Sequence, residues 1–155
     1  MYRFSVTIDI DAARARVWRA LCDPREVVQW DTGVVEAIDA PADYPQPGQH
    51  VRWRYANGPF RTLHDRPQQV AQERALRSFI SIGPAWFDET YTLEDRDASA
   101  GLITGPGCRL TASMDVKVPL WMGGAIAERL YAGPESRRTV EASLRAIKAH
   151  CEASP

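Results

Sequence analysis

Residues 4–30, with the sequence FSVTIDIDAARARVWRALCDPREVVQW, carry the pattern that decides the fold. The first part alternates apolar and polar residues, as a strand with one buried face does. An Arg-rich amphipathic stretch follows. Pro24 then ends one short helix and opens another, because proline is tolerated in the first turn of a helix but not in its interior. The segment therefore predicts an antiparallel strand over 3–10 followed by two short helices in a V.

Strand signals continue from residue 33 to residue 118. Asn57-Gly58 lies between two alternating runs and predicts a hairpin with a two-residue type I′ turn, since such a turn needs positive φ at both central residues. That turn would fix the register of the hairpin and carry His64 to the inward face. The pairs expected on this face are Tyr55–Phe60, Trp53–Thr62 and Val51–His64.

A second hairpin is predicted around the turn at Gly83-Pro84, between strands over about 70–82 and 86–95. Pairing of the residues that flank this turn makes Glu89 point inward with the aromatic residues of its strand. The inward pairs and neighbours expected here are Ser78–Glu89, Leu76–Tyr91, Phe87 and Leu93. The last strand, over 108–118, alternates without a break.

The segment 126–151 changes from the period of a strand to that of a helix. Its stripe recurs at steps of four and three and stays in phase through Gly133-Pro134, so we predict one long helix with a kink at the proline. The positions of this stripe are Ile126, Leu130, Gly133, Arg137, Val140, Leu144, Ile147 and Cys151.

Length, composition and charge limit the function classes. A chain of 155 residues is expected to form a single domain over 1–155 with its own core. Acidic and basic residues are balanced, with 20 Asp and Glu against 19 Lys and Arg, which argues against a nucleic-acid-binding face. The apolar runs are too short for an integral membrane segment, and the N-terminus lacks the apolar core of a signal peptide, so we expect a cytoplasmic protein.

Motifs for several chemistries are missing from the sequence. It has no GxGxxG, P-loop, GxSxG or HExxH pattern. The cysteines Cys22, Cys108 and Cys151 have no zinc-ligand spacing and are expected to be buried thiols, and the histidines lie far apart. We therefore predict no metal site and no cofactor.

The order of these elements resembles the SRPBCC superfamily, which includes the START-like and birch-pollen-allergen proteins of the helix-grip fold, and especially its bacterial polyketide cyclase/dehydrase and lipid-transport branch. The segments that carry the resemblance are FSVTIDIDAARARVW, LCDPREVVQW, ETYTLED, GCRLT and the terminal helix. The resemblance implies an α+β fold, in which a seven-stranded curved antiparallel sheet wraps around the long C-terminal helix. It also implies a mostly apolar cavity between the sheet and the helix.

Combining the alternation with that fold gives a set of candidate cavity residues. Trp30 is either a core residue that seals the two short helices against the end of the sheet or a ligand contact, and large aromatic side chains are mostly buried in either role. The full set is Trp30, Trp53, Tyr55, Phe60, His64, Ser78, Phe87, Glu89, Tyr91, Leu110, Met114, Gly133 and Arg137.

Three residues of this set need a partner if they are buried, because an unpaired buried polar group costs about 1–3 kcal/mol. His64 is either a core histidine bonded to backbone or a ligand contact that can act as an acid or base. Glu89 is either a structural or water-exposed residue or a carboxyl whose pKa is raised by burial. Arg137 either extends to water or turns inward, where it would pair with Glu89 or with a ligand carboxylate or phenolate.

Two functions from different classes follow from these features. In the first, which we favour, the cavity binds a small hydrophobic or aromatic molecule, such as a lipid, a quinone-like ring or a polyketide. In the second, the protein is a cyclase or dehydratase in which His64 or Glu89 moves protons. A protein-binding co-chaperone domain is a lesser hypothesis, because no exposed apolar strip is evident in the sequence. Whether the protein is an enzyme and which oligomeric state it adopts are left open by the sequence.

Overall fold

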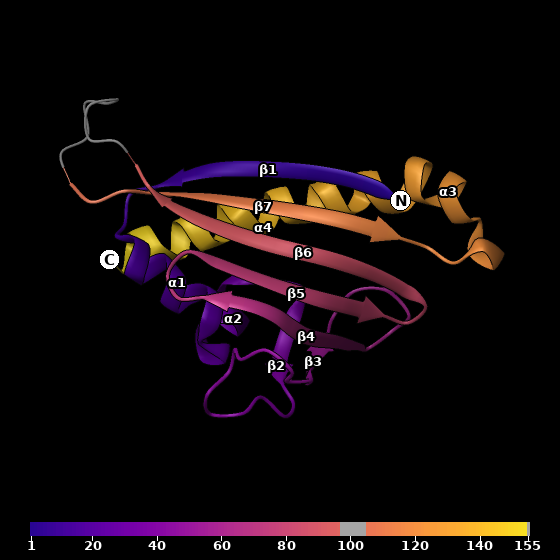
Figure 1. The fold of residues 1–155 in the computed structure, drawn as a ribbon, viewed down its shortest axis with the longest axis horizontal. Helices are drawn as coiled ribbons and strands as arrows, with labels where there is room; N and C mark the ends of the chain where they lie inside the picture. The colour runs from indigo at the N-terminus through magenta and orange to yellow at the C-terminus, as the bar shows by residue number, and fades with distance from the viewer. Residues whose placement is uncertain (97–104, 155) are drawn as a thin grey trace.

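Seven antiparallel strands form one curved sheet in the computed structural model, which describes residues 1–96 and 105–154 (Figure 1). The strands are β1 (Tyr2–Ile10), β2 (Val34–Ala37), β3 (Val51–Tyr55), β4 (Thr62–Ala71), β5 (Ala75–Ile82), β6 (Ala85–Asp95) and β7 (Cys108–Lys117). Their order in the sheet is β1-β7-β6-β5-β4-β3-β2. The predicted seven-stranded sheet is therefore confirmed.

Two short helices follow β1, as predicted, and they are α1 (Arg14–Cys22) and α2 (Pro24–Trp30). The Asp23 side chain caps α2 by accepting a hydrogen bond from the N–H of Arg25 at 2.9 Å, and Pro24 occupies the first turn. Trp30 is buried at the end of α2, and its Nε1 donates to the carbonyl of Ala20 at 2.8 Å. This bond joins the two helices and holds the V in place.

The C-terminal part of the chain is helical, as predicted, and lies across one face of the sheet (Figure 1). Its segments are η2 (Leu120–Met122), α3 (Gly124–Ala127), the π-helical turn η3 (Glu128–Ala132) and α4 (Gly133–Ala153). The π-helical turn stands just before Pro134, where a proline removes one backbone donor from the helix. No helix among the described residues is long and apolar enough to span a membrane.

The predicted apolar stripe is buried only in the later part of this helical region. Val140, Leu144, Ile147 and Cys151 are buried, whereas Ile126, Leu130 and Arg137 are exposed. A π-helical turn holds an extra residue, and one extra residue rotates the preceding segment by about 100° relative to the following one. Glu128, the first residue of the turn, is consequently buried, and its Oε1 accepts the N–H of Val118 at 2.9 Å.

The predicted register of the hairpin between β3 and β4 is wrong by one residue. The observed pairs are Val51–Asp65, Arg52–His64, Trp53–Leu63 and Arg54–Thr62. Because side chains alternate along a strand, a change of one residue turns each side chain of β4 to the opposite face. Asp65 therefore points inward in place of the expected His64.

The physical reason lies in the loop of this hairpin. A two-residue type I′ turn needs positive φ at both Asn57 and Gly58, but only Gly58 has it, with a φ of 72°. Pro59 follows and restricts the backbone on both sides of its peptide bond. The loop is therefore longer than expected, and the N–H of Tyr55 donates to the carbonyl of Arg61 at 2.8 Å.

The strand predicted over 70–82 is divided between β4 and β5 by a turn at Glu73, whose φ is 59°. Such a conformation is uncommon outside glycine, so the sequence carries no ordinary signal for this turn. β4 also continues past Pro67, with a bulge between Pro67 and Gln69 that tolerates the missing N–H. Beyond the turn the predicted register is confirmed, with the pairs Ser78–Glu89 and Leu76–Tyr91.

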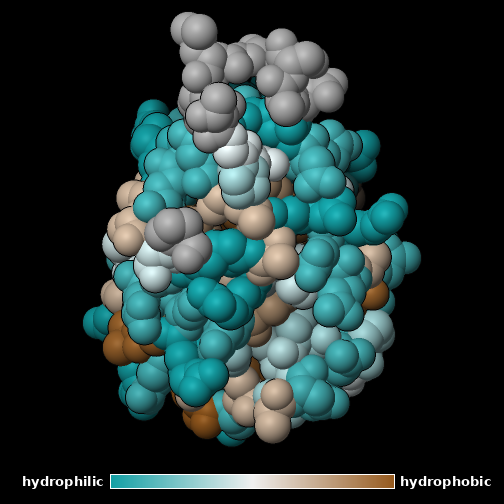
Figure 2. All heavy atoms as spheres, turned by 90° about the vertical axis from the view of Figure 1, so that its left-hand side faces the viewer, coloured by the Kyte–Doolittle hydropathy of each residue, from teal (hydrophilic) through white to brown (hydrophobic). Residues whose placement is uncertain are grey.

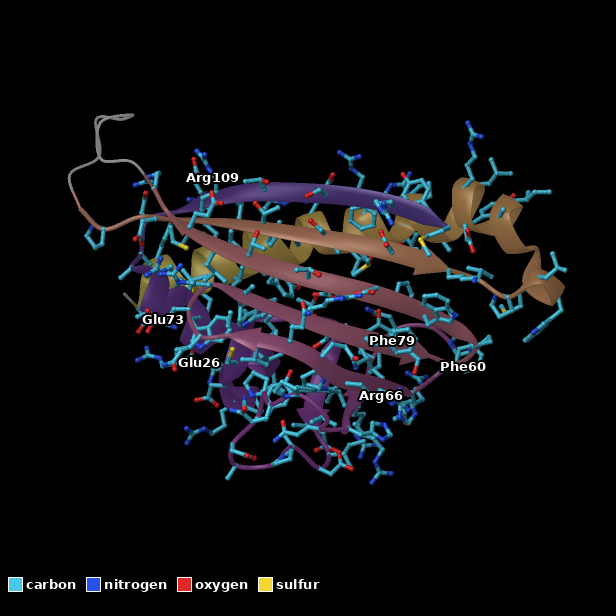
Figure 3. All side chains as sticks on the ribbon, viewed as in Figure 1. Glu26, Phe60, Arg66, Glu73, Phe79 and Arg109 are labelled. Carbon is cyan, nitrogen blue, oxygen red and sulfur yellow. The ribbon has the colours of Figure 1, made fainter. Side chains whose placement is uncertain are left out.

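Ion pairs between neighbouring strands occupy the outer face of the sheet. Arg109 on β7 (Figure 3) lies opposite Asp9 on the edge strand β1, and its Nε donates to Asp9 at 2.9 Å. Arg77 and Asp88 pair across β5 and β6 at 2.6 Å. Exposed pairs of this kind contribute about 0–1 kcal/mol each. These pairs also show that Arg77 and Arg109 point away from α4.

Exposed apolar side chains cluster on the segment that leads into α4. Leu120 is 88% exposed and Trp121 is 77% exposed. The other exposed large apolar residues of this segment are Met122, Ile126, Leu130 and Tyr131. The opposite end of the molecule shows mainly hydrophilic side chains (Figure 2). The expectation that no exposed apolar strip exists is therefore wrong. In the sequence, Ile126 and Leu130 resemble core positions because they share the helical phase of the buried stripe.

Gly133 was predicted to line the cavity from its position in the stripe. The structure places it against β1 instead. A Cβ atom at this position would overlap the ring of Tyr2 and lie 2.6 Å from the carbonyl oxygen of Glu128. Only a residue without a side chain allows the π-helical turn and the start of α4 to approach β1 this closely.

We expect Gly133→Ala to lower the free energy of unfolding by about 1–3 kcal/mol, because the added methyl group overpacks this contact. Urea denaturation followed by circular dichroism measures the change. Ser136→Ala, in the next turn of α4, is the control and should change stability by less than about 0.5 kcal/mol. A Gly133→Ala protein as stable as the wild type would contradict the close approach.

Candidate functional site

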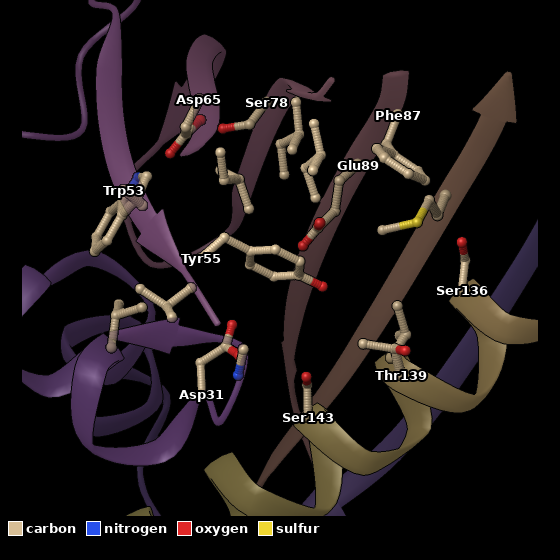
Figure 4. A pocket seen from close by; sticks show the side chains of 18 of the residues that line it. Asp31, Trp53, Tyr55, Asp65, Ser78, Phe87, Glu89, Ser136, Thr139 and Ser143 are labelled. Atoms are coloured by element: carbon tan, nitrogen blue, oxygen red, sulfur yellow. The ribbon is translucent and has the colours of Figure 1, made fainter. Parts of the chain in front are cut away.

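A cavity of about 350 Å³ lies between the inward face of the sheet and α4. This volume falls within the usual range of small-molecule sites. The walls come from the end of α2, strands β2 to β7 and one side of α4, and side chains from the sheet and from α4 point into the space (Figure 4). On the α4 side, short hydroxyl side chains face the sheet, namely Ser136, Thr139 and Ser143.

Most of the predicted cavity residues border this space. They are Trp30, Trp53, Tyr55, Ser78, Phe87, Glu89, Tyr91 and Met114. On β3 and on β5 to β7, the predicted inward faces agree with the structure. Trp30 reaches the cavity because α2 lies at the end of the sheet. The predicted residues that lie elsewhere are Phe60, His64, Leu110, Gly133 and Arg137.

Three of these displaced residues have clear positions. Phe60 lies in the loop between β3 and β4, where it is 43% exposed and its ring covers Gly83. Leu110 is fully buried in the core beyond the cavity wall. Arg137 extends to water, which was one of its two alternatives, and its Nε donates to Glu141 at 3.1 Å. The guanidinium therefore lies outside the cavity.

His64 lies on the outer face of the sheet beside His50. The Nε2 of His50 and the Nδ1 of His64 are 2.9 Å apart. Partial burial lowers the pKa of His64, and the nearby His50, Arg66 and Arg52 act in the same direction. The imidazole therefore favours its neutral form, and its position separates it from the groups that line the cavity.

Asp65 occupies the inward position that the sequence assigned to His64. It is 5% exposed, and its Oδ2 accepts a hydrogen bond from the Tyr44 hydroxyl at 2.7 Å. Burial raises the pKa of the carboxyl, and the nearby polar groups of Tyr44, Ser78 and Trp53 oppose this effect. Its Oδ1 has no hydrogen-bond partner among the described residues. Asp65 therefore brings an unsatisfied acceptor to the cavity wall.

Glu89 points from β6 into the space between Tyr55 and the hydroxyl-bearing side of α4 (Figure 4). Burial raises the pKa of its carboxyl to about 7, while the Tyr91 hydroxyl lowers it and the nearby Asp65 and Asp31 raise it further. A carboxyl with this pKa changes charge near neutral pH and can donate or accept a proton there. Glu89 is half-buried, and its inward direction and raised pKa agree with the second of its two alternatives.

Asp31, Tyr44 and the polar side of α4 were not predicted as cavity residues. Asp31 directly follows α2, its Oδ1 accepts the N–H of Gly33 at 2.9 Å, and burial raises its pKa. Asp31 and Tyr44 belong to loops, where no periodic pattern indicates direction. On α4, however, the hydroxyl residues recur at steps of three and four beside the apolar stripe, and that spacing was a usable signal.

The described residues offer little for metal or thiol chemistry. No three His, Cys, Asp or Glu side chains within residues 1–96 and 105–154 are grouped so that they could hold a metal ion. Cys22, Cys108 and Cys151 are buried, and burial raises the pKa of each thiol, that of Cys22 to about 12. These thiols are therefore poor nucleophiles at neutral pH.

Comparison with known proteins gives one family and a consistent fold. The family model described as polyketide cyclase / dehydrase and lipid transport matches residues 1–152. A search of curated proteins finds no match.

Several solved structures are similar along nearly the whole chain. A START superfamily protein from Mycobacterium smegmatis has a TM-score of 0.71 and 12% identity, with 100% of each chain covered. A conserved protein from Geobacillus kaustophilus has a TM-score of 0.70 and 13% identity, covering 98% of this chain and 96% of that chain. DynU16, a protein of the dynemicin biosynthetic locus, has a TM-score of 0.64 and 20% identity, covering 96% of this chain and 48% of that chain. At such identities the likeness shows the fold alone, the α+β helix-grip fold.

The difference in unfolding free energy between Glu89→Gln and the wild type is expected to change in favour of the variant as the pH rises, because only the wild type is destabilised. The carboxyl titrates near 4.5 when unfolded and near 7 when folded, so the folded state binds more protons between these values. Wild-type stability contributed by the neutral carboxyl is therefore complete below about pH 4.5 and is lost as the pH rises to about 7. The glutamine variant lacks this loss, so the difference in unfolding free energy should shift by about 3 kcal/mol between pH 4 and pH 8 in urea denaturation.

Asp88 provides the matched control, because it precedes Glu89 on β6 but faces outward. Its bond to Arg77 lowers its pKa, so its contribution is present at neutral pH and is lost as the pH falls through the folded pKa. Asp88→Asn should thus differ from the wild type at pH 8 and converge with it in acid, which is the opposite trend. If Glu89→Gln and the wild type showed parallel pH profiles, the pKa of Glu89 would not be raised in the folded state.

Proposed function

The chain belongs to the polyketide cyclase / dehydrase and lipid transport family, and we propose that it binds a small hydrophobic or aromatic molecule in the cavity between the sheet and α4. The observation that carries this proposal is a mostly apolar space of about 350 Å³ with a few inward polar groups. Sites of this composition bury the body of a ligand in apolar contacts and orient it with the polar groups. Trp53, Tyr55 and Phe87 offer aromatic surfaces for a ring.

A route of entry supports the same proposal. Glu135 and Thr139 border the cavity and are also exposed to solvent. The cavity therefore reaches solvent along this side of α4, where Ser136 and Ser143 also lie (Figure 4). A ligand can enter there without separation of the strands.

Glu89 favours a second candidate, a cyclase or dehydratase that acts on the bound molecule. In a loss of water from a β-hydroxy ketone, the Glu89 carboxylate would take a proton from the carbon next to the carbonyl. The carboxylic acid so formed would then give this proton to the hydroxyl, which leaves as water while the double bond forms. A carboxyl with a pKa of about 7 is suited to both steps, because neither form is strongly favoured at neutral pH.

Filling the cavity tests the binding proposal. Ser143→Phe places a ring in the cavity from α4 and should weaken binding of the neutral fluorescent probe N-phenyl-1-naphthylamine at least tenfold. Ala142→Phe is the matched control, because Ala142 precedes it on α4 and is exposed, outside the cavity lining. Fluorescence titration measures both affinities, and circular dichroism verifies the fold. Equal affinities of Ser143→Phe and the wild type would overturn the assignment of this cavity as the binding site.

The enzymatic candidate is tested with 4-hydroxy-4-phenylbutan-2-one, whose loss of water yields a strongly absorbing enone. Wild-type protein should accelerate this reaction, and Glu89→Gln should reduce the acceleration by about 10²-fold, the scale of one acid–base group. Asp88→Asn, on the outer face of the same strand, should keep the wild-type rate. No acceleration over buffer by the wild type, or full activity of Glu89→Gln, counts against catalysis through Glu89.

A further inference from the structure

The charged residues that line the cavity all have the same sign. Asp31, Asp65, Glu89 and Glu135 border it, and no Lys, Arg or His lines it among the described residues. Glu135, at the mouth of the cavity, pairs with Arg138 at 3.4 Å. Asp31, Asp65 and Glu89, by contrast, have no ion pair among the described residues, whereas several acidic side chains on the outer face of the sheet pair with arginines, as Asp9 does with Arg109. A bound molecule can supply a positive charge to these three carboxyls.

We propose that the cavity selects molecules whose apolar body carries a protonated amine, and that it discriminates against carboxylates such as fatty acids. This inference rests on the proposed function, since it specifies the ligand of the same cavity. Two further observations support it besides the sign of the charges.

The first observation is the state of Asp65. Its side chain is almost fully buried, and Oδ2 accepts from the Tyr44 hydroxyl. The Ser78 and Trp53 side chains lie close enough to lower the pKa of the carboxyl, but Oδ1 has no hydrogen bond of full geometry among the described residues. Oxygen atoms of an ionised carboxyl only accept hydrogen bonds, so the group that satisfies Oδ1 must be a donor. An ammonium has N–H donors and a charge that the carboxyl can neutralise, and such charge-assisted bonds are stronger than neutral ones.

The second observation is the arrangement of the groups around the candidate position of the amine. Ser78 on β5 pairs with Glu89 on β6, whereas Asp65 on β4 pairs with Ile80, two residues farther along β5. Two strand spacings and a rise of two residues separate the backbones of the two acidic residues by about 12 Å, with Ser78 and Ile80 between them. An ammonium over this part of β5 therefore lies between the carboxyls. Trp53 and Tyr55 flank the same space (Figure 4), and aromatic faces attract cations.

Whereas an ammonium is attracted by this cavity, a carboxylate ligand is repelled. Each nearby carboxyl repels it when ionised, and no cationic side chain in the described lining compensates for its loss of water. The apolar walls accept its body as well as that of an amine. Discrimination therefore comes from the head group, which is the property to vary in an experiment.

Binding of an amine should also displace a proton from Glu89. The titratable groups that line the cavity with Glu89 are the following: Tyr91 on its own strand, Asp65 on β4, Tyr55 on β3, Asp31 after α2, Tyr44 in the loop before β3, and Glu135 at the mouth on α4. None of them is cationic, so the ligand ammonium is the group that favours the ionised carboxyl. The ammonium keeps its proton, and the proton of Glu89 passes to the buffer.

The test uses three naphthalene probes of nearly the same shape, 1-naphthylmethylamine, 1-naphthylmethanol and 1-naphthoate, titrated calorimetrically into the full protein at pH 6.5. We expect the amine to bind at least tenfold more tightly than the alcohol and the naphthoate at least tenfold more weakly. In buffers of different ionisation enthalpy, the amine should release up to one proton per bound molecule and the alcohol none.

Variants assign the preference to the cavity carboxyls. Glu89→Gln should bind the alcohol as the wild type does, lose most of the preference for the amine and release no proton. Asp65→Asn tests the same idea independently if Glu89→Gln does not fold. Glu141→Gln, which removes a carboxyl of α4 outside the cavity lining, is the control and should keep the preference.

The outcomes separate this inference from the proposed function. If the alcohol binds but the amine binds no more tightly, the cavity binds apolar molecules and the amine preference is wrong. If none of the three probes binds, the proposed cavity function itself is contradicted. An amine preference that survives in both Glu89→Gln and Asp65→Asn would also overturn the inference, because it would not come from these carboxyls.

Discussion

Antiparallel pairing of β4, β5 and β6 is the constraint on which the cavity depends. Each residue of a paired strand has a fixed face, so the register decides which chemistry meets α4. The pairs of β5 with β6 bring Ser78 and Glu89 side by side on the inward face. The pairs of β3 with β4 do the same for Asp65 and put His64 outside. The polar content of the cavity is therefore a result of backbone pairing as much as of composition.

Helix α4 divides the space beneath the sheet into a closed part and an open part. Leu144, Ile147 and Cys151 fill the core near the end of the helix. Ser136, Thr139 and Ser143 border the cavity instead, and their short side chains leave the opposite wall uncovered. Charges are sorted in a similar way, because arginines lie on the outer face of the sheet in ion pairs while the inward face keeps acidic residues without basic neighbours.

Much of this arrangement follows from local patterns in the sequence. Alternation predicted the inward direction of Glu89, and Asp23-Pro24 predicted the break between the short helices, because both signals depend only on neighbouring residues. The face of β4 was not predictable in this way. It depends on a loop in which Asn57 does not take the conformation that its pairing with glycine suggests.

The same limit explains the other differences. Gly133 and Pro134 indicated a bend, but whether a bend is a kink or a π-helical turn depends on contacts with β1 that are distant in the sequence. Asp31 and Tyr44 reach the cavity from loops, and only the tertiary structure brings them there. Candidate residues on regular strands could therefore be predicted well, and those that depend on loop length could not.

The loop between β3 and β4 has an evolutionary consequence for proteins built on this plan. Inserting or deleting one residue there forces either a bulge or an exchange of faces in one of the two strands, which would bring imidazole in and send carboxylate out. Changes of two residues preserve the faces and need only a longer or shorter connection. Homologues should therefore vary this loop by even steps when they keep the same interior, and an odd step should accompany a switch in the chemistry of the molecules they accept.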